Sequence, residues 1–441
     1  MQNQATFGGN DLAHPVQAIA LTYNNQQTGP CMRPSCRRIT VNNYPNTNTN
    51  ITSTMSNRVL RFGIPAEGFL DGKNSYLAFN LRGTAATGTS YFIPTTDAMF
   101  HRISVYSNSG TLIEDIQNQE LLGCILRHDT SYNYQSSVGR ASLNMGVVDV
   151  NAADANTQYL TDSRYICELR GSGFLNAFNY IPCKALANSQ ANAFFIEIEF
   201  SSAQKMITQT GGTDAGYVVS NVVYVADVVY DDMKEAQVDE LLMNGPLVFH
   251  FQTWKAHNNT ILANSQNNIL TISEFQESLE EIAVVFKNQN NTDNINNALW
   301  QFDFPNNAEV ITSMQLKIGN YLYPVQSLQQ NSGIAQQYYE YAKATGRNKC
   351  YSEGHLPLAF NGAQSTAATT DYIFRYPLRI MPTDANGETV DYFFGINTRV
   401  NPQSINLYVN SNTLTNTYTV QSYVKYDVSL VIMKTESYIV S

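Results

Sequence analysis

The sequence has little charge. Only 14% of its 441 residues are Asp, Glu, Lys or Arg, against about 25% in an average soluble protein. Asn, Gln, Ser and Thr fill many polar positions instead, as we expect where much of a surface faces other protein. The formal net charge is -10, so the body of the molecule repels phosphate groups, which argues against direct nucleic-acid binding.

Cysteine is also scarce. A disulfide framework is not expected in a chain this long from only six residues, Cys31, Cys36, Cys124, Cys167, Cys183 and Cys350. The pair at 31 and 36 lacks the second pair or the nearby histidines that a zinc site needs, so we expect free, mostly buried thiols. The sequence shows no signal-peptide pattern at its start and no apolar run near the ~18 residues of a membrane span. We therefore expect a protein made and kept in a reducing compartment.

Catalytic motifs are missing as well. The segment GFLDGKN at 68–74 has the wrong glycine spacing for a phosphate-binding loop, and neither H-E-x-x-H nor G-x-S-x-G occurs. The six histidines are far apart, and no acidic cluster has the ligand spacing of a calcium loop. The sequence predicts no enzyme activity, no cofactor and no metal. A glycosidase needs two carboxylates that face each other across a cleft, and a sequence does not show which carboxylates meet in space, so this alternative stays open.

Strand patterns are abundant. From residue 58 onward, stretches such as NSYLAFNLRG and NAFFIEIEFSSA alternate apolar and polar residues between Gly, Pro, Asn and Ser clusters. One helix interrupts them at 231–245, where Asp231 or Asp232 can cap the start and Gly245-Pro246 ends it. We predict an N-terminal arm at 1–57, one β domain at 58–230, a linker helix at 231–245 and a second β domain at 246–441.

The two β domains repeat each other. Five strand patterns recur in the same order at separations of 195 to 215 residues, with first members starting at 75, 99, 176, 193 and 216 and second members at 280, 314, 371, 404 and 417. Each half has about eight strand candidates, with long excursions between some of them. This organisation is typical of the jelly roll, in which two antiparallel sheets pack face to face. The predicted fold class is all-β: two tandem eight-stranded antiparallel jelly rolls with short helices in linker and loops.

Two local features are candidate functional elements. In the repeat MQLKIGNYLYPVQS at 314–327, Gly319 with Tyr323 and Pro324 predicts a sharp turn at a sheet end. In the arm, whose only acid is Asp11, the segment CMRPSCRR supplies Arg33, Arg37 and Arg38 as possible contacts to an anionic partner. Ordinary surface contacts are the alternative for these arginines.

Four stretches carry a family resemblance: GFLDGKNSYLAFNLRG at 68–83, MFHRISVYSNSGTLIEDIQN at 99–118, the strand ending Ile318 to Pro324, and YFFGINTRVNPQSINLYVN at 392–410. With the tandem order, they resemble the double jelly-roll major capsid proteins of double-stranded DNA viruses. The similarity is greatest to those of polinton-like viruses and virophages, with the large nucleocytoplasmic DNA viruses next. It covers roughly 58–441, and the arm before residue 58 matches nothing in the family.

The resemblance implies a structural role. Members of this family form homotrimers in which six jelly rolls make a pseudo-hexagonal capsomer of an icosahedral virion shell assembled in the infected cell. The implied partners are further copies of the chain, penton and minor or cement capsid proteins, and an inner membrane beneath the arm. The resemblance also implies outer towers or trimer contacts for the loops after residues 117 and 331. A glycan-binding or glycan-cleaving double jelly-roll protein is the alternative.

Overall fold

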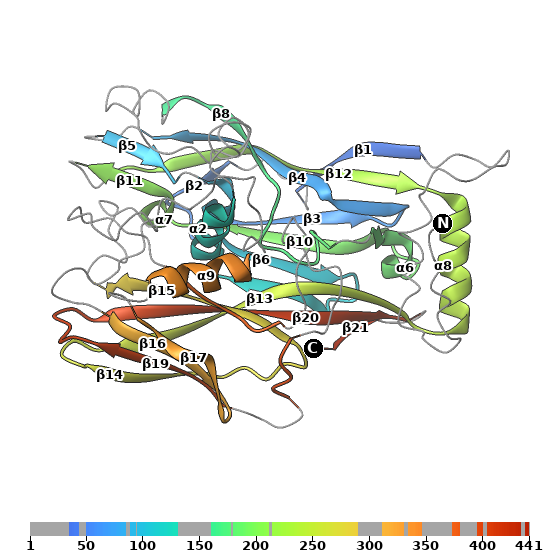
Figure 1. The fold of residues 1–441 in the computed structure, drawn as a ribbon. Coiled ribbons are helices and arrows are strands. Elements are labelled where there is room, and N and C mark those ends of the chain that lie inside the picture. The colour runs from blue at the N-terminus through green and yellow to red at the C-terminus, as the bar shows by residue number, and fades with distance from the viewer. Residues whose placement is uncertain are drawn as a thin grey trace.

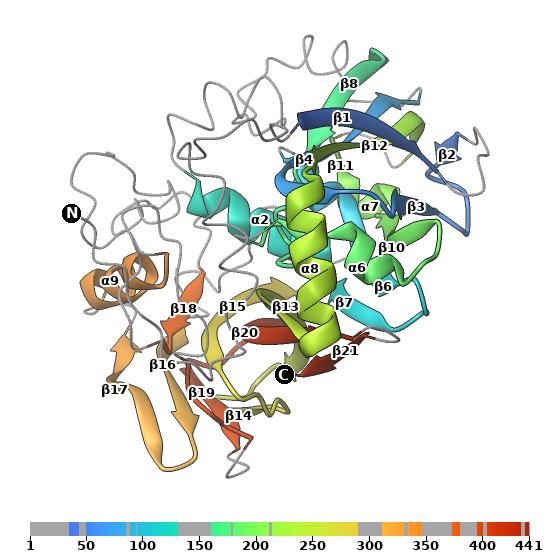
Figure 2. The ribbon, with the colours of Figure 1, turned by 90° about the vertical axis from the view of Figure 1, so that its right-hand side faces the viewer.

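The computed structural model describes thirteen stretches of the chain: 35–43, 50–84, 89–93, 95–130, 160–177, 180–210, 214–289, 311–329, 334–345, 373–379, 395–399, 404–433 and 437–440. More than half of these residues lie in β-strands, and every strand pair among them is antiparallel. Figures 1 and 2 show two sandwiches side by side, one built from the first half of the chain and one from the second.

The first sandwich has two main sheets. One has the order β1 (Ser35–Asn42), β12 (Tyr217–Tyr230), β4 (Phe69–Gly83) and β8 (Ser163–Cys167), with β2 (Ile51–Thr52) on β12 and β9 (Ile181–Pro182) on β4. The other has the order β3 (Val59–Pro65), β10 (Asn192–Phe200), β6 (Phe100–Ser107) and β7 (Leu112–Gln117). A short pair, β5 (Thr89–Phe92) and β11 (Ile207–Thr210), lies apart from both.

The second sandwich repeats this plan. Its first sheet has the order β13 (Leu247–Ile261), β20 (Tyr418–Ile432), β15 (Leu279–Asn288) and β18 (Phe374–Pro377), with β21 (Ser437–Val440) on β20. Its second sheet has the order β14 (Asn267–Ile272), β19 (Ile405–Ser411), β16 (Ile311–Ile318) and β17 (Tyr321–Gln329). Strand by strand, both sandwiches have the sheet orders of a jelly roll, which confirms the predicted fold class.

Four of the five repeated sequence patterns occupy equivalent strands. The patterns at 75 and 280 lie in β4 and β15, those at 99 and 314 in β6 and β16, those at 193 and 404 in β10 and β19, and those at 216 and 417 in β12 and β20. The fifth pair differs: the pattern at 176 leads into β9, which pairs with Phe69 and Leu70 at the start of β4, whereas its counterpart leads into β18, whose equivalent in the first sandwich is β8. These four local patterns therefore produce the same strand in the same place twice.

Short helices occupy the connections. They are η1 (Thr96–Met99), α2 (Gln119–Asp129), α6 (Cys183–Ala187), α7 (Ala203–Met206), α8 (Asp232–Asn244) and α9 (Ile334–Ala344). The linker helix α8 spans one end of the molecule from one sandwich to the other (Figures 1 and 2). The Asp231 side chain caps it by accepting from the backbone N–H groups of Met233 and Lys234, and Gly245 follows its last turn.

The predicted arm at 1–57 contributes strands to the first sandwich. Residues 35–42 form β1 and pair with β12 over their whole length, and residues 51–52 form β2. In the first half of SCRRITVN, Ser35, Cys36, Arg37 and Arg38 are polar and exposed, whereas in the second half Val41 is buried. The buried face of β1 is limited to Ile39 and Val41, which is too short a pattern to predict the whole strand, although β1 is the equivalent of β13 in the second sandwich.

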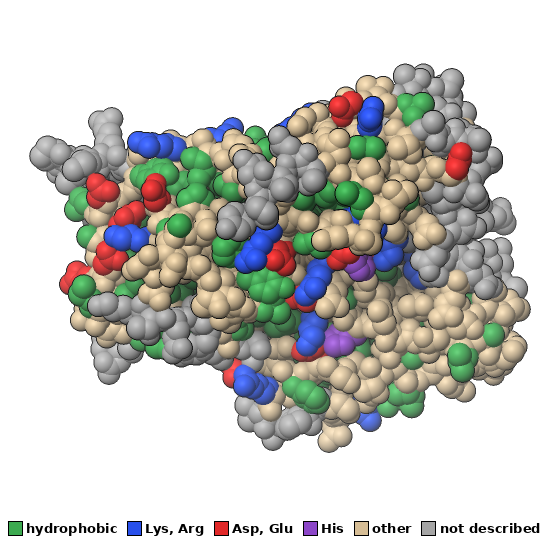
Figure 3. Space-filling model, turned by 180° about the vertical axis from the view of Figure 1, so that it is seen from behind, with side chains coloured by type: hydrophobic (Ala, Val, Ile, Leu, Met, Phe, Trp, Pro, Cys, Tyr) green, Lys and Arg blue, Asp and Glu red, His purple; other side chains and the backbone are tan. Residues whose placement is uncertain are grey.

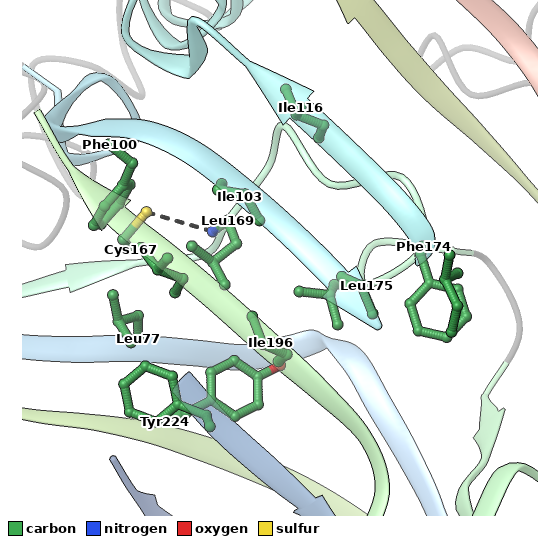
Figure 4. Packing of buried hydrophobic residues seen from close by; sticks show 14 of the residues in the cluster. Leu77, Phe100, Ile103, Ile116, Cys167, Leu169, Phe174, Leu175, Ile196 and Tyr224 are labelled. Carbon is green, nitrogen blue, oxygen red and sulfur yellow. Dashed lines mark hydrogen bonds between the residues drawn. The ribbon is translucent and has the colours of Figure 1, made fainter. Parts of the chain in front are cut away.

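The core of the first sandwich is rich in aromatic and branched side chains. Phe79 packs edge-to-face on Phe100 and Phe200, with ring centroids 6.1 and 5.5 Å away. Figure 4 shows side chains from both sheets and from the 168–177 segment meeting in this core, with the Leu169 N–H donating to Cys167 Sγ at 3.4 Å. Full burial of a leucine, isoleucine or phenylalanine side chain contributes about 1.5–3 kcal/mol to the free energy of unfolding, relative to leaving it exposed.

Candidate functional site

The two jelly rolls meet through an aromatic contact. Phe174, in the segment that follows β8, places its ring 5.6 Å from Phe249 and 5.4 Å from Phe251, both on β13. The residue before it, Gly173, lies so close to β13 that a Cβ there would be 1.3 Å from the carbonyl oxygen of Gln252. The backbones of the two rolls are thus in direct contact, and only glycine fits at position 173.

A buried carboxyl group lies at the same contact. Glu114 on β7 is only 3% exposed. Its carboxylate accepts from Thr253 Oγ1 on β13 at 2.6 Å, from the Gly173 N–H at 2.9 Å and from Ser172 Oγ. Burial raises the pKa of Glu114, although these donors favour the ionised form. This side chain therefore ties β7, the 172–174 segment and the second roll together.

A second polar contact joins the helices that follow β7 and β17. Arg375 on β18 is 3% exposed and pairs with Glu281 on β15 and with Asp129 at the end of α2. Tyr341 on α9 donates its hydroxyl to Asp129 at 2.9 Å, and the Arg375 guanidinium lies 5.5 Å from the centre of the Tyr341 ring. The excursion helices α2 and α9 are thus linked through one buried arginine.

The residue before Glu281, Glu280, is a buried carboxyl group with a raised pKa. Glu280 is 1% exposed, and its carboxylate is 3.7 Å from Arg379. Burial and the nearby Asp427 carboxylate raise the pKa of Glu280 to about 8. Burial, with Arg379, lowers the pKa of Lys425. We call the following seven side chains the buried charge cluster, which has one more carboxyl group than it has cations: Asp129, Glu280, Glu281, Asp427, Arg375, Arg379 and Lys425.

The arginines singled out in the arm have different surroundings. Arg38 on β1 donates from Nε and Nη2 to the two carboxylate oxygens of Asp227 at 2.7 and 2.8 Å. The Arg37 guanidinium lies over the Tyr230 ring, 5.1 Å from its centre. Arg33 lies outside the described residues. Arg37 and Arg38 therefore lie side by side on an edge strand, where Arg38 already has an acidic partner within the chain.

The β16–β17 hairpin contains the other predicted residues. Gly319 has a φ of +59° and begins the two-residue connection to β17, where a left-handed conformation favours glycine. Tyr323 pairs with Leu316 on β16. Pro324 follows inside β17, at the point where the register shifts, and its carbonyl accepts from Gln315 Nε2 at 3.0 Å. The turn is thus at Gly319, and Pro324 lies within an irregular part of the strand.

Exposed apolar side chains accompany this hairpin. Tyr321 is 66% exposed, Leu322 41% and Val325 83%. The four strands of the sheet β14-β19-β16-β17 contain a single charged residue, Lys317. A solvated sheet surface usually carries several charged side chains. Depletion of charge is typical of the central part of protein interfaces, and this sheet shares that property.

The corresponding sheet of the first roll is charged. On its outer face Arg102 donates to Asp115 at 2.6 Å, and Arg61 lies 3.6 Å from Glu197. Figure 3 shows basic, acidic and histidine side chains interspersed near the middle of the rear face of the molecule. The equivalent sheets of the two rolls therefore present different surfaces, one of ion pairs and one nearly free of charge.

The described residues contain no group of three or more His, Cys, Asp or Glu side chains placed to hold a metal ion. None of the described helices is long and apolar enough to cross a membrane. Among the cysteines the structure describes, Cys36 is exposed and Cys124, Cys167 and Cys183 are buried, all as free thiols.

Sequence reasoning did not identify the residues at the contact between the rolls. Glu114 lies in TLIEDI, where an acid in a strand gives no sign of being buried. Gly173 and Phe174 follow β8 in GSGF, which looks like an ordinary turn. Their partners on β13 lie 75 or more residues further along the chain, and no local pattern carries that information.

Comparison with known proteins adds a set of structural neighbours. No protein-family model matches the sequence, and no curated protein matches it either. The structure is similar to the PBCV-1 virus capsid quasi-atomic model, with a TM-score of 0.58 and 9% identity over 95% of this chain and 100% of that one. It is similar to the Faustovirus major capsid protein, with a TM-score of 0.58 and 9% identity over 92% of each chain. For the mavirus major capsid protein, the TM-score is 0.50 and the identity 11%, over 94% of this chain and 93% of that one. The chain thus has the double jelly-roll fold of these viral capsid proteins.

Proposed function

We propose that this chain is a major capsid protein. In this role three copies form a pseudo-hexagonal capsomer, and the capsomers build an icosahedral shell around a double-stranded DNA genome. The protein is then part of the virion, assembled inside the infected host cell. Its partners are further copies of itself, penton proteins and minor or cement capsid proteins.

One observation carries the proposal: two jelly rolls with identical sheet orders are held in a fixed relation within one chain. The aromatic contact at Phe174, the carboxyl group of Glu114 and the helix α8 all fix the second roll against the first. Three such rigid pairs supply six similar units, which is what a three-fold particle needs to fill a six-fold position. The structural neighbours reported above are capsid proteins, which supports the same role.

The segment before β1 is proposed to contact neighbouring capsomers or an inner membrane. Ser35 pairs with Tyr230, directly before the linker helix, so the chain enters β1 at the end of the molecule where α8 lies. Deletion of residues 1–34 leaves β1 intact and is expected to abolish shell assembly while capsomers still form. Unchanged shell assembly by the deletion variant would contradict this part of the proposal.

Electron microscopy of the purified full-length protein tests the capsomer directly. We expect class averages with three-fold symmetry and a six-sided outline, and hexagonal sheets at higher concentration. Class averages of single two-lobed particles at all concentrations would contradict the proposal.

A further inference from the structure

The two rolls of one chain use different sides for the contact between them. The first roll contributes the side of its sandwich where β7 ends the sheet, together with α2 and the 172–174 segment. The second roll contributes the β13 edge of its sandwich, where Phe249 and Phe251 contact Phe174. One side of a jelly roll therefore packs against a different side of the next, as in a head-to-tail arrangement.

Strand register identifies the equivalent of β13 in the first roll. Arg38 on β1 pairs with Asp227 on β12, and Gln252 on β13 pairs with Asp427 on β20. In both places the side chain on the edge strand donates to the aspartate, from Arg38 at 2.7 Å and from Gln252 Nε2 at 3.2 Å. Strand β1 is thus the equivalent of β13, and Arg37 holds the position that Phe251 holds in the second roll.

Register also identifies the equivalent of β7 in the second roll. Glu114 pairs with Val105, which pairs with Ile196 on β10. Tyr323 pairs with Leu316, which pairs with Leu407 on β19. Since β10 and β19 carry one of the repeated sequence patterns, Tyr323 on β17 holds the position of Glu114. The helix α9 follows β17 as α2 follows β7.

Each of these equivalent surfaces is uncovered among the described residues. On β13, Phe249 and Phe251 are 0% exposed because the first roll lies over them, whereas all four residues from Ser35 to Arg38 on β1 are exposed. On β17 the residues flanking Tyr323 include Tyr321, Leu322 and Val325, which are 41–83% exposed. Both uncovered surfaces lie where the duplicated fold would repeat its internal contact.

We infer that β17 of one copy, through Tyr321, Leu322, Tyr323 and Val325, packs against the β1 side of the first roll of a second copy. The inference rests on the proposed function and assigns its copy-to-copy contact. This contact between copies repeats the contact between the two rolls of one chain. In it, β17 takes the place of β7, and β1 takes the place of β13. Each copy has one surface of each kind, so the contact is heterologous and three copies close a ring.

The side chains on the two surfaces suit one another. Arg37 is exposed at the position of Phe251, with its guanidinium over the Tyr230 ring, and the facing strand offers tyrosine rings and apolar side chains without an acid. Arginine stacks on aromatic faces, and tyrosine and arginine are enriched where two proteins meet. A strongly acidic or basic partner would find no complementary charge on β17, which favours a second copy of this chain as its occupant.

A charge on β17 tests the assignment. Val325→Glu changes a side chain that is 83% exposed, and Ile269→Glu is the matched control, since Ile269 is 62% exposed on β14 at the opposite edge of the same sheet. By light scattering, we expect Val325→Glu to lower the mass from three times 49.2 kDa to 49.2 kDa, while Ile269→Glu keeps the larger mass. Circular dichroism spectra of both variants that match the spectrum of the unmodified protein show that folding is intact.

A cross-link tests which strands meet. Cys36 on β1 is an exposed free thiol, and β1 and β17 lie on opposite sides of one molecule in Figures 1 and 2, so a short bismaleimide joins them only between copies. We expect Val325→Cys to give covalent dimers and trimers on denaturing gels. We expect Ile269→Cys, and Val325→Cys combined with Cys36→Ser, to give none.

The outcomes separate this inference from the proposed function. If the unmodified protein is a monomer, the proposed function fails. If it forms the three-copy species but Val325→Glu keeps that mass, or Ile269→Glu loses it equally, or Cys36 does not cross-link to position 325, the assignment of β17 and β1 is wrong while the capsomer stands.

Discussion

Glu114 connects three parts of the molecule through one carboxyl group. It accepts hydrogen bonds from β13, from two backbone N–H groups and from Ser172, all of which lose an acceptor if the carboxylate is replaced. A buried donor without a partner costs about 1–3 kcal/mol. The stability of the contact between the rolls therefore depends on this side chain more than on the surface ion pairs.

Glu114→Gln is expected to lower the free energy of unfolding by about 1–3 kcal/mol, because an amide nitrogen cannot accept from the donors that face one carboxylate oxygen. Urea denaturation measures the change. The matched control is Glu240→Gln on the exposed side of α8, which should change stability by less than about 0.5 kcal/mol. Equal effects of the two substitutions would show that Glu114 does not hold the contact.

Glu280 makes stability depend on pH. The pKa of Glu280 is about 8 in the folded protein, and 4.5 is the ordinary value, which applies to the unfolded chain. Between these two pH values the folded protein holds a proton that the unfolded chain has lost. The sign follows directly: the free energy of unfolding falls as the pH rises from about 5 to about 8. Thermal unfolding measured across this range should show a falling midpoint.

Glu280→Gln is the control for this pH effect, because the amide is neutral throughout and resembles the protonated acid. The variant should show a shallower fall of the unfolding midpoint. Some slope remains, since burial raises the pKa of Glu114 in the same direction. A variant with the same slope as the unmodified protein would mean that Glu280 does not take up the proton.

At the scale of elements, local patterns predicted the strands that have one buried face. The alternation in NSYLAFNLRG and NAFFIEIEFSSA gave β4 and β10, and Asp231 with Gly245-Pro246 gave α8 within a residue or two at each end. Strand β1 was not predicted because its first four residues are exposed and so show no alternation. Edge strands stabilised mainly by backbone pairing leave little trace in the sequence.

The close approach of the 172–174 segment to β13 gives a prediction at this scale. A Cβ at position 173 would overlap the Gln252 carbonyl, so Gly173→Ala requires the two rolls to move apart. We expect a loss of about 3 kcal/mol in the free energy of unfolding, at the upper end for overpacked cores. Gly245→Ala is the control, because an added Cβ there meets nothing within 4 Å. A neutral Gly173→Ala would contradict the direct backbone contact.

At the scale of the whole molecule, the repeat predicted two jelly rolls, and their sheet orders are the same in the structure. How the rolls lie against each other could not be predicted, because the contact joins residues far apart in the chain, such as Phe174 with Phe249 and Asp129 with Arg375. The same limit applies to the buried charge cluster, whose members come from α2, β15, β20 and the segment at β18. Local sequence specifies the strands that have a buried face, and the relation between the rolls depends on long-range packing.

The central claim is that one chain supplies two of six similar units in a closed trimer. The most direct test is the mass of the purified full-length protein in solution, measured by light scattering at micromolar concentration. The account predicts a stable species at three times 49.2 kDa. A single species of 49.2 kDa across the concentration range would contradict it.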